Sequence, residues 1–168
     1  MRTSVLVLAL LALGACKSSP SPTRDVVTPM NASARITPEE RASGEVMAVL
    51  RSQCVAWNRG DLEAYMSAGY WNSPELTFYS GGNATKGYDA TLEHYKKSYQ
   101  AEGATMGHLE FYGLETVTLG EEAQLARGHW KLTFEKKPAL GGVFSVVLKR
   151  LPQGWRIVHD HTSVDTTP

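Results

Sequence analysis

The fold of this chain is decided near its C-terminus, by Gly154-Trp155-Arg156-Ile157-Val158-His159-Asp160-His161-Thr162-Ser163, where an apolar strand core runs directly into titratable side chains. Successive residues of a β-strand point to opposite faces of the sheet. Strict alternation therefore predicts one face that carries Trp155, Ile157, His159 and His161. The opposite face would carry the carboxylate of Asp160, together with Arg156, Val158 and Thr162.

Capping signals predict that the domain begins with helices. Thr37, Pro38 and Glu40 have the spacing of a capping box with proline at the first helical position, and an apolar stripe follows as far as Trp57. Gly60 ends this helix and the next residue can cap a second, shorter one. The aromatic spacing of residues 88–99 predicts a third helix, after a short strand at residues 76–80.

The second half of the domain has the alternation and turn residues of a β-meander. Long strands are predicted at residues 108–119, 123–135, 142–151 and 154–164, separated by glycine and proline turns. Helices first and antiparallel strands last indicate an α+β fold in which N-terminal helices pack on the concave face of a strongly curved antiparallel sheet.

The N-terminal residues predict export and a lipid anchor. Arg2 precedes an apolar run, residues 5–13, that is too short to span a bilayer as a permanent helix. The following Leu13-Gly14-Ala15-Cys16 resembles the bacterial lipobox, in which the cysteine becomes the acylated first residue. We therefore expect residues 1–15 to be a lipoprotein signal peptide and Cys16 to hold the protein on the periplasmic side of a membrane in the bacterial cell envelope. The alternative is an ordinary secretory signal that contains a cysteine.

Composition limits the domain plan and the partners. Residues 16–36 are rich in proline and small polar residues and are expected to be a disordered tether, followed by one domain at residues 37–168. The charges balance, with 17 basic and 17 acidic residues, so nucleic acid is not an expected partner. Lipidation of Cys16 leaves Cys54 without a disulfide partner. No phosphate loop or dinucleotide fingerprint occurs, so no cofactor is expected.

Two motifs resemble those of a known superfamily. Asn58-x-Gly60-Asp61-x-Glu63-Ala64-Tyr65 and Trp155-x-Ile157-Val158-His159-x-His161-x-Ser163 are similar to segments of the nuclear transport factor 2-like superfamily, nearest to the SnoaL-like proteins and the association domain of calcium/calmodulin-dependent kinases. The resemblance implies a conical fold that encloses a pocket, and commonly a homodimer formed through the sheet. The same fold serves isomerases, cyclases, dehydratases, hydrolases and binding modules, so it does not select a function.

The resemblance also implies candidate pocket residues. It places Arg156, Asp160 and Thr162 on the pocket side of the last strand, and Lys131 at a position where association domains carry an arginine for carboxylate ligands. In the SnoaL-like and ketosteroid isomerase pattern, an inward carboxylate such as Asp160 is the general acid-base, which requires a desolvated site. Tyr65 or Tyr79 would stabilise an oxyanion. The alternative is a structural ion pair between Asp160 and one of the two cations.

Two further features are left open by the sequence. Trp130 and Lys131 point to opposite faces of one strand, so Trp130 lines either the pocket or a dimer contact. His159 and His161 have a spacing that can chelate a metal, with His129 as a third candidate, but no acidic or thiol ligand completes a pattern. We therefore predict no metal site.

Two functions remain possible from the sequence. The first is a membrane-tethered domain that binds a small, partly hydrophobic ligand or assembles as a homodimer without catalysis. The alternative is a cofactor-independent lyase or isomerase with Asp160 as general acid-base.

Overall fold

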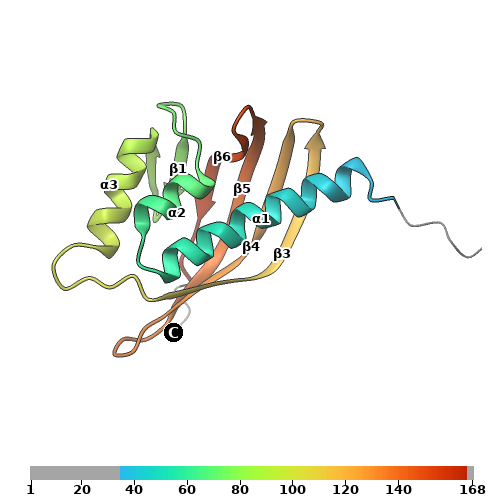
Figure 1. The fold of residues 1–168 in the computed structure, drawn as a ribbon. Helices are drawn as coiled ribbons and strands as arrows, with labels where there is room; N and C mark the ends of the chain where they lie inside the picture. Colours follow the sequence, from blue (N-terminus) through green and yellow to red (C-terminus); the bar gives the residue numbers. More distant parts are fainter. Residues whose placement is uncertain (1–34, 166–168) are drawn as a thin grey trace, which may run out of the picture. The chain divides into compact units, whose positions relative to one another are not determined.

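The computed structural model of the protein describes residues 35–165, and within them it forms one compact unit that begins at Ile36. The predicted signal peptide and residues 16–34 of the predicted tether lie outside the described residues. The elements of the described part are, in chain order, α1 (Pro38–Asn58), α2 (Leu62–Gly69), β1 (Thr77–Ser80), β2 (Asn83–Lys86), α3 (Tyr88–Tyr99), β3 (His108–Gly120), β4 (Ala123–Thr133), β5 (Leu140–Leu151) and β6 (Gly154–Thr162). Helices lie against one face of the curved sheet (Figure 1). The predicted α+β class and the packing of N-terminal helices on a curved sheet are therefore confirmed.

The sheet is mixed and not wholly antiparallel. Its strand order is β2-β1-β6-β5-β4-β3, and β3 to β6 form the predicted meander. However, β1 pairs in parallel with β6 and antiparallel with β2. The strand β2 was not predicted from the sequence, because Asn83–Lys86 is short, polar and without apolar alternation. A tight turn at Gly81 and Gly82 connects β1 to β2. Both glycines have positive φ, a conformation that glycine adopts without steric cost.

The first helix begins as the sequence predicts. The Thr37 hydroxyl accepts a hydrogen bond from the Glu40 backbone N–H at 3.1 Å, and the Glu40 carboxylate accepts one from the Thr37 N–H at 2.7 Å. Asp61 likewise caps α2 by accepting from the N–H of Ala64 at 2.9 Å. Both caps satisfy backbone donors that would otherwise lack partners, so they fix where the two helices start.

No helix in residues 35–165 is long and apolar enough to cross a membrane.

Hydrogen bonds fasten the end of α1 to the sheet. The Asn58 side-chain amide donates to the Leu109 carbonyl at 2.9 Å and accepts from the Leu109 N–H at 2.7 Å, as a neighbouring strand would. The indole N–H of Trp57 is 3.2 Å from the carbonyls of both Met106 and Gly107. These contacts hold the aromatic end of α1 over the concave face of the sheet, where the central cavity lies.

A β-bulge in β6 changes which residues share a face. Val147 pairs with His159 but the adjacent Leu148 pairs with Ile157, so Val158 is an extra residue in β6. The prediction from strict alternation was therefore wrong on one point. Trp155 and Ile157 lie on the concave face with Asp160 and Thr162, whereas Arg156 shares the outer face with His159 and His161.

Candidate functional site

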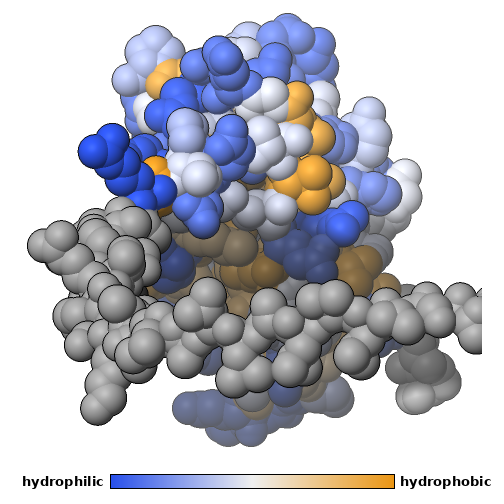
Figure 2. Space-filling model, turned by 90° about the vertical axis from the view of Figure 1, so that its right-hand side faces the viewer, coloured by the Kyte–Doolittle hydropathy of each residue, from blue (hydrophilic) through white to orange (hydrophobic). Residues whose placement is uncertain are grey.

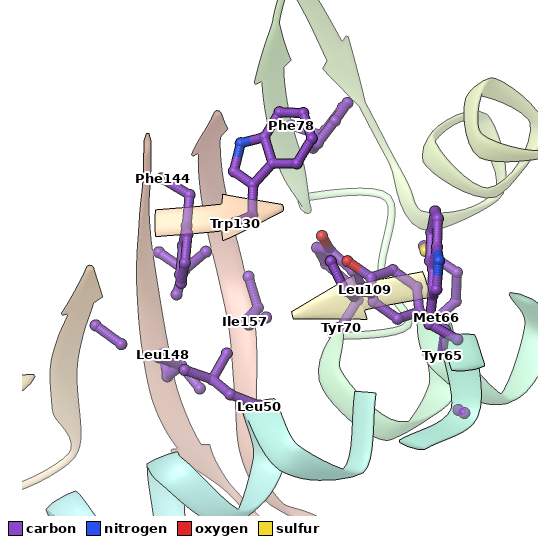
Figure 3. Packing of buried hydrophobic residues seen from close by; sticks show 14 of the residues in the cluster. Leu50, Tyr65, Met66, Tyr70, Phe78, Leu109, Trp130, Phe144, Leu148 and Ile157 are labelled. Atoms are coloured by element: carbon purple, nitrogen blue, oxygen red, sulfur yellow. The ribbon is translucent and has the colours of Figure 1, made fainter. Parts of the chain in front are cut away.

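A cavity lies between the helices and the concave face of the sheet. Its volume is about 90 Å³. The aromatic residues on its helical side are Trp57, Tyr65, Tyr70, Tyr95 and Tyr99. Those on its sheet side are Phe78, Phe111, Trp130 and Phe144. Figure 3 shows Trp130, Phe144 and Ile157 of the sheet facing Tyr65, Tyr70 and Leu50 across this region.

The carboxylate of Asp160 is the main polar group in the cavity wall. Its residue is only 6% exposed. Oδ2 accepts a short hydrogen bond of 2.6 Å from the Tyr70 hydroxyl, whereas Oδ1 is buried and has no hydrogen-bond partner among the described residues. One carboxylate oxygen is therefore fixed, and the other remains available to a bound molecule.

Within residues 35–165, the carboxylate of Asp160 has no ion-pair partner. No lysine or arginine among these residues lines the cavity, and the imidazole of His94 in its wall packs on the rings of Phe78 and Tyr95. Burial raises the pKa of Asp160 to about 7, and the hydrogen bond from Tyr70 opposes this shift only in part. The carboxyl group thus exchanges its proton near neutral pH, which is the property required of a general acid-base.

The structural ion pair considered from the sequence is not formed. Arg156 lies on the outer face, because of the bulge in β6, and donates to the Trp155 carbonyl at 2.8 Å. Lys131 is exposed, since Trp130 and Leu132 are the buried residues of that part of β4. Neither cation lines the cavity, so the implied pocket positions of Lys131 and Arg156 are wrong.

Three tyrosine hydroxyls form a chain that ends at Asp160. The hydroxyl oxygens of Tyr70 and Tyr95 are 3.1 Å apart, and those of Tyr95 and Tyr65 are 3.5 Å apart. While Asp160 is ionised, it accepts the one proton of the Tyr70 hydroxyl. Because each hydroxyl has one proton, Tyr95 then donates to Tyr70 and Tyr65 donates to Tyr95. Burial raises the pKa of all three phenols, with further contributions from the negative charge of Asp160. All three protons are therefore directed toward the carboxylate.

The other predicted site residues divide between the two faces of the sheet. Tyr65, Trp130 and Thr162 line the cavity with Asp160. Tyr79 does not, because in β1 it is Phe78 that points inward beside Asp160. Tyr79 is 42% exposed on the outer face, where its ring packs edge-on against His159 with centroids 5.2 Å apart.

Sequence reasoning missed the two residues that connect to Asp160 most directly. Tyr70 follows α2 and lies next to β6 at an isolated bridge to Ile157, a contact that no sequence pattern signals. Tyr95 belongs to the apolar stripe of α3, which identifies it as buried but not as a hydrogen-bonding residue. Their role depends on chain segments that meet only in the folded domain.

The histidines of the outer face have structural contacts. Nδ1 of His159 is 2.7 Å from the Thr77 hydroxyl, and burial, followed by the neighbouring His161, lowers the pKa of His159. His129 stacks on Tyr112 with ring centroids 4.9 Å apart. Within residues 35–165, no three His, Cys, Asp or Glu side chains are grouped as metal ligands.

Comparisons with known proteins agree with the fold. A family model described as a SnoaL-like domain matches residues 46–167. A nuclear transport factor 2-like protein of unknown function from Shewanella oneidensis MR-1 is 36% identical, with a TM-score of 0.66 over 72% of this chain and 98% of that one. A putative calcium/calmodulin-dependent protein kinase type II association domain from Thiobacillus denitrificans ATCC 25259 is 17% identical, with a TM-score of 0.58 over 70% of this chain and 92% of that one. No curated relative matches the sequence.

Proposed function

The chain belongs to the SnoaL-like domain family, and on this basis we propose that its cavity binds a small, largely apolar molecule that donates a hydrogen bond to Asp160. The observation that carries this proposal is the unpartnered Oδ1 of a buried carboxylate at an aromatic-lined cavity. Ligand sites typically combine apolar walls with a few placed polar groups.

The energetics of Asp160 favour a ligand site over a packing role. A buried polar atom without a partner destabilises a fold by about 1–3 kcal/mol, and a buried charge costs more. An apolar side chain at this position would avoid both costs, and an asparagine would avoid the cost of the buried charge. The carboxylate is therefore best explained by a bound molecule that restores the missing interaction.

Binding can be tested with benzyl alcohol, a ring compound that carries one hydroxyl donor. We expect saturation-transfer NMR to detect its contact with the protein. The Val146→Phe variant, which fills the cavity wall with a larger side chain, should lose the signal. Circular dichroism of the variant establishes that it is folded. Equal signals from the folded variant and the unchanged protein would contradict binding in the cavity.

A second candidate function is cofactor-independent isomerisation or elimination, favoured by the raised pKa of Asp160. In an isomerisation, ionised Oδ1 takes a proton from the carbon between a carbonyl and a double bond. The electron pair moves into a dienolate, and the now neutral carboxyl returns the same proton at the far end of the former double bond. The reaction needs no other acid, base or cofactor.

This chemistry can be tested with 3-cyclohexen-1-one, whose conversion to the conjugated 2-cyclohexen-1-one is followed by ultraviolet absorbance. The Asp160→Asn variant should lose about 100-fold or more of the rate above buffer, since positioned acid-base groups typically contribute about 10²–10⁴-fold. The Glu135→Gln variant removes an exposed acid outside the cavity and serves as the control. An Asp160→Asn variant as active as the unchanged protein would exclude this function for Asp160.

We further propose that the domain forms a homodimer through the outer face of the sheet. Tyr112 of β3 and Val143 of β5 are large and exposed there, with Val143 at 50%. On the part of the side in Figure 2 that the grey atoms do not cover, apolar groups lie among hydrophilic ones. Sedimentation velocity should show a dimer that Val143→Glu dissociates, whereas Val55→Glu on the exposed side of α1 leaves it intact. A monomeric parent protein would refute this interface.

We also propose that the protein is anchored in the bacterial cell envelope. The lipobox-like segment ending at Cys16 supports a lipid-anchored protein on the periplasmic side of a bacterial membrane.

A further inference from the structure

We propose that the ligand of the Asp160 cavity is a small organic cation, a protonated amine with an apolar body, whose N–H group donates to Oδ1 of Asp160. The inference rests on the proposed binding function and adds the chemical class of the ligand. Three independent features of the cavity support it: its charge, the direction of its hydrogen bonds, and its aromatic walls.

The charge of the cavity is unbalanced. Asp160 is the one acidic residue among the described residues that line it, and no lysine or arginine lies beside it. The one basic side chain in the described lining is the imidazole of His94, which packs on Phe78 and Tyr95 and forms no ion pair with Asp160. An ionised carboxylate in this setting lacks a counter-charge, which a protonated amine would supply. An anionic ligand would instead be placed next to a carboxylate with no cation to hold it, so acids and phosphates are disfavoured.

The hydrogen-bond donors of the buried tyrosine and tryptophan side chains in the cavity wall are already used within the protein. The hydroxyl protons of Tyr65, Tyr95 and Tyr70 run in sequence toward Oδ2 of Asp160. The indole N–H of Trp57 is shared by two backbone carbonyls, and that of Trp130 donates to the Ser163 carbonyl at 3.0 Å. What remains deep in the cavity is an acceptor, Oδ1, without a donor. A ligand that brings N–H donors fits this deficit better than one that brings an acceptor.

The walls of the cavity favour positive charge. Indole and phenol rings have electron-rich faces that attract cations, most strongly where water is excluded. The helical side of the cavity supplies the rings of the three hydroxyl-chain tyrosines and of Trp57. The sheet side supplies Trp130 and Phe78, which face them. The carboxylate can therefore form an ion pair with an ammonium group, and the aromatic rings around it can form cation–π contacts with the same group.

The inference can be tested by isothermal calorimetry on the full chain with three ligands of the same size and ring. These are benzylamine, which is protonated at neutral pH, benzyl alcohol, and benzoate. At about pH 8 we expect benzylamine to bind at least about tenfold more tightly than benzyl alcohol, because charge-assisted hydrogen bonds are roughly twice as strong as neutral ones, and benzoate not to bind.

The Asp160→Asn variant tests whether the carboxylate causes the preference for benzylamine over benzyl alcohol. It should lower the affinity for benzylamine about tenfold or more and bring benzylamine and benzyl alcohol to within about threefold of each other. The Glu135→Gln variant, which removes one exposed negative charge outside the cavity, should keep the full preference. Circular dichroism at the same pH confirms that both variants are folded.

The outcomes separate this inference from the binding proposal. Benzyl alcohol that binds as tightly as benzylamine would overturn the cationic ligand and leave the binding function standing. A preference for benzylamine that survives in the Asp160→Asn variant would also overturn it. If none of the three compounds binds, both proposals fail.

Discussion

The Asp160→Asn variant is expected to be more stable than the parent protein above neutral pH and about equal to it in acid. Burial raises the folded-state pKa of Asp160 from 3.8 to about 7, so between these values the folded protein holds a proton that the unfolded chain releases. Stability from this group is therefore present in acid and is lost as the pH rises through about 7. The full shift corresponds to about 4 kcal/mol. Asparagine does not ionise, and its carbonyl can still accept the Tyr70 hydrogen bond.

Urea denaturation of both proteins at about pH 5 and about pH 8 tests this expectation. The unfolding free energy of the variant minus that of the parent should be about 2–4 kcal/mol larger at pH 8 than at pH 5. The Glu135→Gln control changes an exposed acid and should show no such gain, since surface charges contribute little to stability. A variant that is less stable than the parent at pH 8 would mean that the carboxylate has a stabilising partner, contrary to the geometry described above.

Replacement of Trp57 by alanine should be among the most destabilising single changes in the domain. The side chain is only 3% exposed and packs edge-on against the rings of Tyr65 and Tyr99, at centroid distances of 5.1 and 4.8 Å. Its N–H also joins α1 to the backbone before β3. Loss of a buried tryptophan typically costs about 3–5 kcal/mol, through lost burial and the space left behind.

The Trp57→Phe variant separates the ring from the N–H. It keeps an aromatic side chain and loses the donor, so its cost should be smaller, about 1–3 kcal/mol for the two unpaired carbonyls and the reduced packing. Chemical denaturation of the three proteins under one condition gives both values. An alanine variant within about 1 kcal/mol of the parent would show that Trp57 is not part of the core.

Local signals were sufficient for much of the fold. The capping box at Thr37 and the cap at Asp61 depend on residues within one helical turn, and the meander depends on alternation and turn residues next to one another. The parallel pairing of β1 with β6 joins residues far apart in the sequence, and β2 has no apolar pattern. Neither can be detected by periodicity, which describes a strand but not its partner.

The candidate site shows how one residue alters a prediction. Alternation separates Ile157 from Asp160, but the bulge at Val158 places both on the cavity side and moves Arg156 to the outer face. The sequence identified Asp160 as the central residue through a resemblance. It could not identify the absence of a cation or the hydroxyl of Tyr70, because these depend on how α2, β4 and β6 meet in space.

The lack of a lysine or arginine among the described residues of its wall also distinguishes this cavity from the carboxylate pocket that the association-domain resemblance implied. The position expected to supply a positive charge, Lys131, is exposed, whereas its neighbour Trp130 lines the cavity. Similarity to the Thiobacillus denitrificans domain therefore describes the fold alone.

The most direct test of this account is a carbon-13 NMR titration of the Asp160 side-chain carboxyl group, assigned with the Asp160→Asn variant. The account predicts a midpoint of about 7, as expected for a buried carboxylate without a cationic partner. A midpoint at or below the ordinary value of 3.8 would contradict it, because such a value requires a solvated or ion-paired carboxylate.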